Sequence, residues 1–75
     1  METFSVSMNI YRNGRDYELE SLFEAESAKN AAMIFLKDWI DEIAFSKNKE
    51  FFISVSEPNG NITYFIVKNN ILAPA

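Results

Sequence analysis

The pair Asn13-Gly14 lies between two stretches in which apolar and polar residues alternate. Asn-Gly is the strongest short signal for a two-residue hairpin loop, because a type I′ turn needs positive φ at both central positions. The signal predicts strands over residues 3–12 and 15–24. Counting outward from the turn gives a face on which almost every pair is apolar: Ile10 with Tyr17, Met8 with Leu19, Val6 with Ser21, and Phe4 with Phe23. A one-residue slip would destroy this match, so turn and alternation predict the same register.

A helix is expected over residues 28–45, which contain neither Gly nor Pro. Ser27 is a favourable N-cap, because its hydroxyl can accept a hydrogen bond from a free N–H of the first turn. At helical spacing, one stripe of the segment is apolar: Ala28, Ala32, Phe35, Leu36, Trp39 and Ile43. An apolar stripe must be buried, and we therefore expect the helix to pack across one face of a sheet.

A second hairpin is predicted from strands over residues 50–57 and 62–68, joined through Pro58-Asn59-Gly60-Asn61. A loop of two or four residues would place Ile53 opposite Ile66 and Val55 opposite Tyr64. The face away from the helix would then carry Phe52, Phe65 and Val67, whereas a three-residue loop would change this pairing. Residues 69–75 predict a C-terminal tail, in which Ile71 and Leu72 could fold back onto the sheet.

These elements predict one α+β domain that covers residues 1–75 with the order ββαββ. We expect a four-stranded antiparallel sheet in the strand order 2-1-3-4, with one helix packed on one face. The other face of such a sheet is left bare, apart from whatever the tail covers.

The residue types restrict the chemistry. The chain has no cysteine and no histidine, which excludes disulfides, thiol catalysis and Cys-ligated zinc, and removes the commonest general base. No phosphate-binding glycine loop or nucleophile elbow is present. Glu18 and Glu20 share a strand face, but a flat solvated face lacks the cleft that a carboxylate pair needs for hydrolysis. We therefore expect no enzyme activity, no catalytic residue, no cofactor and no metal site.

The charge balance argues against direct binding to nucleic acid. Eleven acidic residues against seven basic ones give a net charge of −4, whereas nucleic-acid binding usually requires a basic face. The opening METFSVSMNI has neither the basic nor the apolar region of a signal peptide. No apolar stretch approaches the roughly 18 residues of a membrane span. The expectation is a cytoplasmic protein, complete from Met1 and without membrane contact.

An acidic series is the first candidate partner-binding region. It consists of Asp16, Glu18, Glu20 and Glu24 of the second predicted strand, continues to Glu26, and has no basic residue between its members. Such charges can protect an edge strand from aggregation. They can also dock onto the basic surface of another protein.

The second candidate region is the bare apolar face with Phe52, Phe65 and Val67. Contiguous exposed apolar residues mark contact surfaces, here for a partner or for a homodimer. The alternative is that the C-terminal tail covers these residues.

The layout of the whole chain resembles that of small acidic accessory proteins of phages and plasmids. The likeness lies in size, negative charge and a hairpin followed by residues 26–32 (ESAKNAA) at the start of an amphipathic helix. Some proteins of this type are anti-CRISPR or anti-restriction inhibitors. The resemblance implies a non-enzymatic inhibitor that blocks a basic, nucleic-acid-binding surface of a host complex, and it assigns no binding residues. The alternative function is a structural or regulatory subunit, or a homodimer, that uses the apolar outer face.

Overall fold

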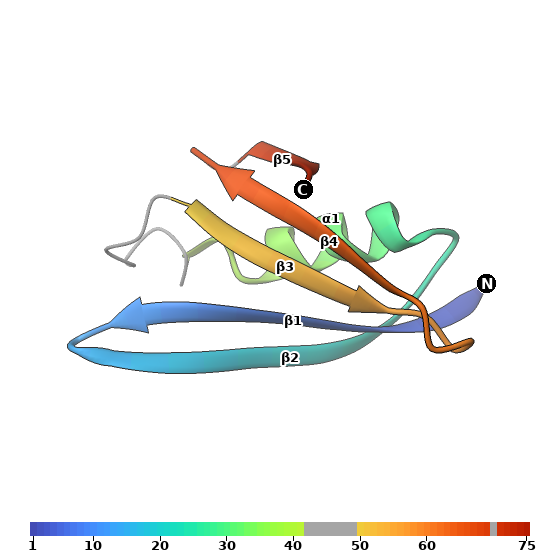
Figure 1. The fold of residues 1–75 in the computed structure, drawn as a ribbon, viewed down its shortest axis with the longest axis horizontal. Coiled ribbons are helices and arrows are strands. Elements are labelled where there is room, and N and C mark those ends of the chain that lie inside the picture. The colour runs from blue at the N-terminus through green and yellow to red at the C-terminus, as the bar shows by residue number, and fades with distance from the viewer. Residues whose placement is uncertain (42–49, 70) are drawn as a thin grey trace.

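The computed structural model describes residues 1–41, 50–69 and 71–75, and within them the chain forms five strands and one helix. The elements are β1 (Glu2–Arg12), β2 (Arg15–Ala25), α1 (Ala28–Asp38), β3 (Glu50–Ser56), β4 (Ile62–Lys68) and β5 (Ile71–Pro74). The strands form one antiparallel sheet in the order β2-β1-β3-β4-β5. In the view of Figure 1, α1 lies behind the strands, so the reader looks at the face opposite the helix.

The first hairpin has the predicted register. Asn13 and Gly14 have φ of 54° and 78°, as a type I′ turn requires. The strands β1 and β2 then pair along their full lengths, with all four predicted apolar-face pairs in place. The expected order of the first four strands, 2-1-3-4, is also confirmed.

The helix begins where the sequence predicts it to begin. The hydroxyl of Ser27 accepts a hydrogen bond from the backbone N–H of Asn30 at 3.1 Å, which confirms the N-cap. The regular helix ends at Asp38, with Trp39 as its C-cap. Ile40 and Asp41 are helical again, and the remainder of the expected helix, residues 42–45 with Ile43, lies outside the described residues.

The core lies between α1 and one face of the sheet. Phe35 is fully buried, and its ring lies 6.1 Å from that of Phe23 and 6.3 Å from that of Trp39. Ala31 and Ala32 are also fully buried, and their small side chains allow the helix to lie close to the strands. The sheet contributes alternate residues, among them Phe4, Val6, Met8, Ile53, Val55 and Val67. Apolar side chains of α1 and of one sheet face are thereby removed from water together.

The second hairpin has a three-residue loop, so the pairing expected from a loop of two or four residues is wrong. The backbone N–H of Glu57 donates to the carbonyl of Asn61 at 2.8 Å, and Pro58, Asn59 and Gly60 form the loop between them. Gly60 has a φ of 93°, which fits a type I turn completed by a left-handed residue. Ile53 therefore lies opposite Phe65 and not Ile66, and Val55 lies opposite Thr63 and not Tyr64.

Because the register differs by one residue from the expected one, two of the three residues assigned to the bare face lie on the other face. Phe65 is only 6% exposed and Val67 is fully buried, because both side chains point to the helix side of the sheet. A shift of one residue in register moves every side chain of a strand to the other face. Phe52 is on the outer face as expected, and its side chain is 63% exposed.

The C-terminal tail extends the sheet as a fifth strand, which the expected four-stranded sheet lacked. Strand β5 pairs with β4, with Leu72 opposite Val67 and Ile71 opposite Lys68. Leu72 packs against the core, whereas Ile71 is 69% exposed. Because β5 lies beside β4, the tail does not cover the outer face.

The corrected register can be tested with a matched pair of substitutions. Phe65→Ala should lower the free energy of unfolding by about 3–5 kcal/mol, because it removes a buried ring and leaves a cavity. Phe52→Ala should change it by about 0.5 kcal/mol or less, because that ring is mostly in water. Urea denaturation measures both values. If Phe65→Ala prevents folding, the milder substitutions Phe65→Leu and Phe52→Leu can be compared instead. The loss of free energy of unfolding should again be larger at Phe65. Equal effects at the two positions would contradict the register.

Candidate protein-binding site

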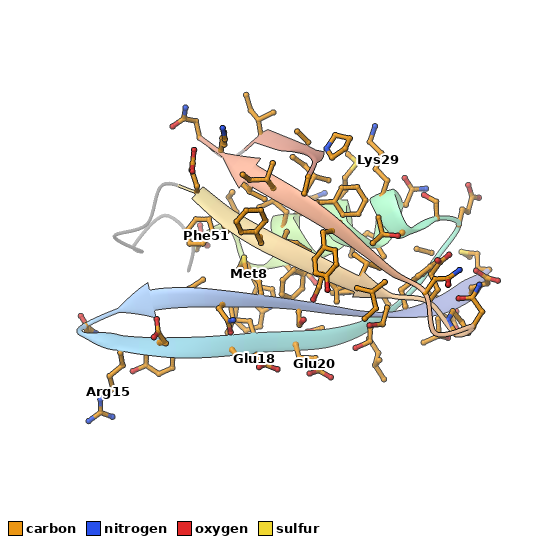
Figure 2. All side chains as sticks on the ribbon, viewed as in Figure 1. Met8, Arg15, Glu18, Glu20, Lys29 and Phe51 are labelled. Carbon is orange, nitrogen blue, oxygen red and sulfur yellow. The ribbon has the colours of Figure 1, made fainter. Side chains whose placement is uncertain are left out.

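The outer sheet face, on the side away from α1, has an acidic strip along β2. The strip consists of Asp16, Glu18, Glu20 and Glu24, all of them exposed. These residues alternate along the strand and therefore point to one side of it. Figure 2 shows Glu18 and Glu20 along the margin of the sheet formed by β2. The predicted series of acids thus forms a charged row along β2, interrupted by the exposed Leu22 between Glu20 and Glu24.

An apolar strip lies on the same face over β3 and β4. It consists of Phe52, Ile62, Tyr64 and Ile66. Phe52 lies opposite Ile66, while Tyr64 lies opposite Ser54, so Phe52 and Tyr64 are diagonal neighbours within reach of one another. Tyr64 is 56% exposed. From the sequence, Ile62, Tyr64 and Ile66 were not expected on this face, because the expected loop length did not assign them to it.

Small hydroxyl side chains separate the two strips. Ser5 of β1 lies opposite Ser56 of β3, and Ser7 lies opposite Ser54. The hydroxyl oxygens of Ser7 and Ser54 share a hydrogen bond of 2.6 Å. Serine side chains rise little above the backbone, so the middle of the outer face lies lower than its two sides.

A hollow of about 180 Å³ lies between the acidic and apolar strips. Its lining consists of Ser7, Met8, Asn9, Glu18, Phe52, Ser54 and Tyr64. The structure thus brings Glu18 and Phe52, which the sequence placed in separate candidate regions, to the same hollow. A carboxylate, two hydroxyls and two aromatic rings line one small concave site.

The other predicted site residues lie apart from this hollow. Asp16 is opposite Tyr11 near the hairpin turn, and Glu24 is opposite Thr3 towards the other end of β2. Both extend the acidic strip without lining the hollow. Phe65 and Val67 belong to the core and present no surface for a partner.

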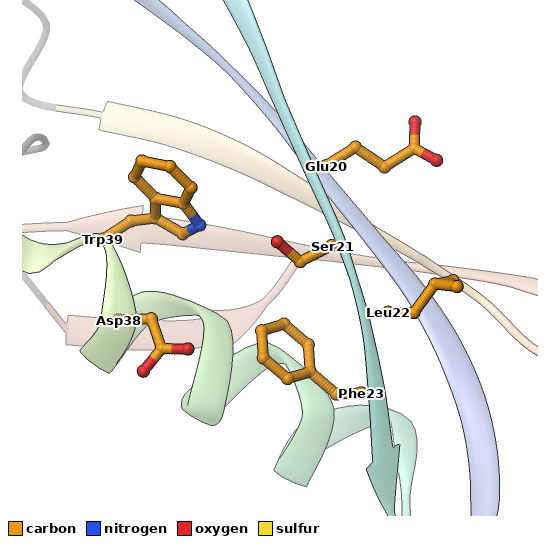
Figure 3. A pocket seen from close by; sticks show the side chains of 6 residues that line it. All are labelled: Glu20, Ser21, Leu22, Phe23, Asp38 and Trp39. Carbon is orange, nitrogen blue, oxygen red and sulfur yellow. The ribbon is translucent and has the colours of Figure 1, made fainter.

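A larger hollow, of about 610 Å³, lies at the edge of β2 on the helix side. Figure 3 shows Ser21 and Phe23 pointing from β2 towards α1, where Asp38 and Trp39 complete the lining. Glu20 and Leu22 lie at its margin and point to the other side of the strand. This hollow is bounded by aromatic rings and one carboxylate, next to the outermost strand of the sheet.

Two basic side chains lie on the helix side of the sheet, opposite the acidic strip. A groove of about 470 Å³ runs between α1 and β5, with Met33, Leu36, Ile40 and Leu72 along it and Lys29 and Lys37 beside them. These two lysines lie on the side of the sheet opposite the acidic strip, where the exposed Asp38 and Asp41 are also found.

Within residues 1–41, 50–69 and 71–75, no three acidic side chains gather closely enough to hold a metal ion. No helix in those parts has the length and apolar character to cross a membrane.

Comparisons with protein-family models, with curated proteins and with solved structures found no match for this chain. Its function is therefore inferred from the geometry and charge of its own surface.

Proposed function

We propose that the protein is a small non-enzymatic binding module that docks its outer sheet face onto a basic surface of another protein. The observation that carries this proposal is the hollow between the two strips. Glu18 contributes a carboxylate to it, and Phe52 and Tyr64 contribute aromatic rings. Each of these groups attracts a positively charged side chain.

The hollow has the size and chemistry to receive one arginine or lysine side chain. Its volume of about 180 Å³ corresponds to about six water molecules at about 30 Å³ each. A guanidinium group can pair with a carboxylate and stack on an aromatic ring at the same time. Ser7 and Ser54 offer hydroxyl acceptors at the same site. A basic residue of the partner would therefore anchor the complex here.

The two strips have different physical roles in this proposal. Exposed charges at the margin of an interface mainly speed the encounter and set its salt dependence. Aromatic side chains near the centre of an interface mainly slow dissociation. The acidic strip would therefore attract and orient the partner, and Phe52 and Tyr64 would hold it.

The inhibitor type implied by the resemblance agrees with this surface. A basic surface that binds nucleic acid is the kind of surface that a row of carboxylates can occupy in place of phosphates. The protein itself carries a net charge of −4, which repels nucleic acid. We therefore propose that it blocks a nucleic-acid-binding surface of a host complex.

The apolar strip favours a second candidate function. Phe52, Ile62 and Tyr64 are each more than half exposed on one face. Such a patch is typical of a surface that is covered in an assembly. The protein could thus be a structural or regulatory subunit, or a homodimer joined through the outer face.

The roles of the two strips can be tested by measuring binding kinetics against a basic partner captured from host lysate. Replacing Asp16, Glu18 and Glu20 together with Asn, Gln and Gln should slow association by about tenfold at low salt and flatten its salt dependence. Phe52→Ser should instead speed dissociation, because it removes a ring from the centre of the contact. Surface plasmon resonance at two salt concentrations measures both rates.

A matched control changes the net charge equally but lies outside the acidic strip. Glu2 and Asp41 are exposed and Glu57 is partly exposed, and replacing Glu2, Glu57 and Asp41 with Gln, Gln and Asn should slow association much less. Equal slowing by both triple variants, or no slowing by either, would contradict docking through the acidic strip.

The second candidate function predicts a different result for the isolated protein. A homodimer joined through the apolar strip should dissociate when Phe52 and Tyr64 are both replaced with Ser, and light scattering measures the mass. A monomer at all concentrations, with the captured partner lost on the same substitutions, would favour the basic-partner proposal over the homodimer.

A further inference from the structure

The two edges of the sheet differ in their capacity to accept another strand. Strand β5 has four residues and ends in Pro74, which has no N–H to donate. Strand β2 has 11 residues and no proline, and among the described residues it pairs only with β1. Alternate residues of such an edge strand direct their backbone N–H and C=O groups away from the sheet. The long open edge of the molecule is therefore the one that carries the acidic strip.

The larger hollow lies where a strand added to β2 would direct half of its side chains. Ser21 and Phe23 line it from β2, and Trp39 and Asp38 line it from α1. Side chains of an added strand alternate between the two faces of the sheet, so every second one would point towards this hollow. The aromatic rings of Phe23 and Trp39 suit an apolar side chain at that position.

The other side chains of an added strand would lie next to the acidic strip. Glu18, Glu20 and Leu22 follow one another on the outer side of β2. Directly opposite residues on paired strands stabilise the pair when they carry opposite charges or are both apolar. The matching segment therefore has two basic residues and one apolar residue at alternate positions, with apolar residues between them for the hollow.

We infer that β2 binds an extended, alternating basic and apolar segment of the partner as a sixth strand of the sheet. This inference rests on the proposed function, because it specifies how the basic partner is held. The backbone hydrogen bonds supply affinity, and the alternate side chains supply selectivity. A second copy of this chain does not suit the edge, because pairing β2 with β2 would bring acidic strips together.

The probe is the synthetic peptide acetyl-TLVKVKVT-amide, in which leucine and the two lysines match Leu22, Glu20 and Glu18 in an antiparallel pairing, and the full chain is observed by NMR and by fluorescence. The sequence has a single tryptophan, Trp39, which lines the hollow and reports its occupation. On binding, the backbone amides of Glu18, Glu20 and Leu22 should become protected from hydrogen exchange, and the Trp39 emission should shift. The glutamate analogue of the peptide should not bind, because its charge is repelled by the strip.

N-methylation of the peptide tests strand addition directly. In an extended peptide the lysine amides face one edge and the valine amides face the other. Methylating the set that faces β2 should weaken binding by at least about tenfold, because it removes two or more hydrogen bonds. Methylating the other set should leave binding nearly unchanged. Equal binding of both methylated peptides, equal loss by both, or no binding of the parent peptide would overturn the inference.

Protein variants separate this inference from the proposed function. The double variant Glu18→Gln with Glu20→Gln should weaken peptide binding, whereas the equal change of charge in Glu2→Gln with Glu57→Gln, outside β2, should leave it nearly unchanged. If capture of the full partner depends on Phe52 and Glu18 while the peptide leaves the β2 amides unprotected, strand addition is wrong and the proposed function stands. If the peptide protects β2 but partner capture ignores both residues, the proposed function is wrong.

Discussion

One amphipathic helix can bury only one face of a sheet, and the rest of this structure depends on that constraint. Phe35, Ala31 and Ala32 are fully buried against alternate residues of the strands. A helix of 11 residues is about 16 Å long at 1.5 Å per residue. It lies on one side of the sheet and therefore does not cover the opposite face. The outer face among the described residues is therefore open to solvent, and every exposed aromatic residue on it is available for contact.

The number of residues in each hairpin loop decides which side chains belong to which face. In the first hairpin, apolar and polar residues alternate for the most part, with exceptions such as Ser21 and Leu22, so pattern and turn agree and the register could be predicted from the sequence. The second hairpin is apolar on both faces, so alternation gives no preference between the two registers. The loop alone distinguishes them, and Pro58 followed by Gly60 forms a three-residue turn. Phe65 and Val67 were misplaced for this reason.

The candidate site was predictable only in the parts that do not depend on that register. Glu18 and Glu20 follow from the first hairpin, and Phe52 was expected on the outer face, where the structure has it. Tyr64 could be assigned to the outer face only from the observed pairing of β3 with β4. Strand β5 was also missed: Asn69 follows β4 with a positive φ of 50°, and Ile71 then pairs with Lys68. A four-residue strand that ends in proline has too little pattern to be predicted from periodicity.

The proposed interactions form one continuous surface. A basic segment paired with the edge of β2 would lie beside the acidic strip, and the small hollow with Glu18, Phe52 and Tyr64 lies a few residues across the same face. Charge, aromatic rings and unpaired backbone groups would act on one partner together, so none of them alone needs to be strong. Like charges along β2 also discourage the protein from pairing with itself.

Phe52 and Tyr64 are exposed on the outer face whereas Phe65 and Val67 are buried on the helix side, and solvent paramagnetic relaxation measures this difference directly. A soluble gadolinium chelate added to a dilute sample should strongly broaden the NMR signals of the Phe52 and Tyr64 rings. The signals of Phe65 and Val67 should change little, because their side chains are buried. Broadening of Phe65 as strong as that of Phe52, or protection of both Phe52 and Tyr64 in the dilute sample, would contradict the account.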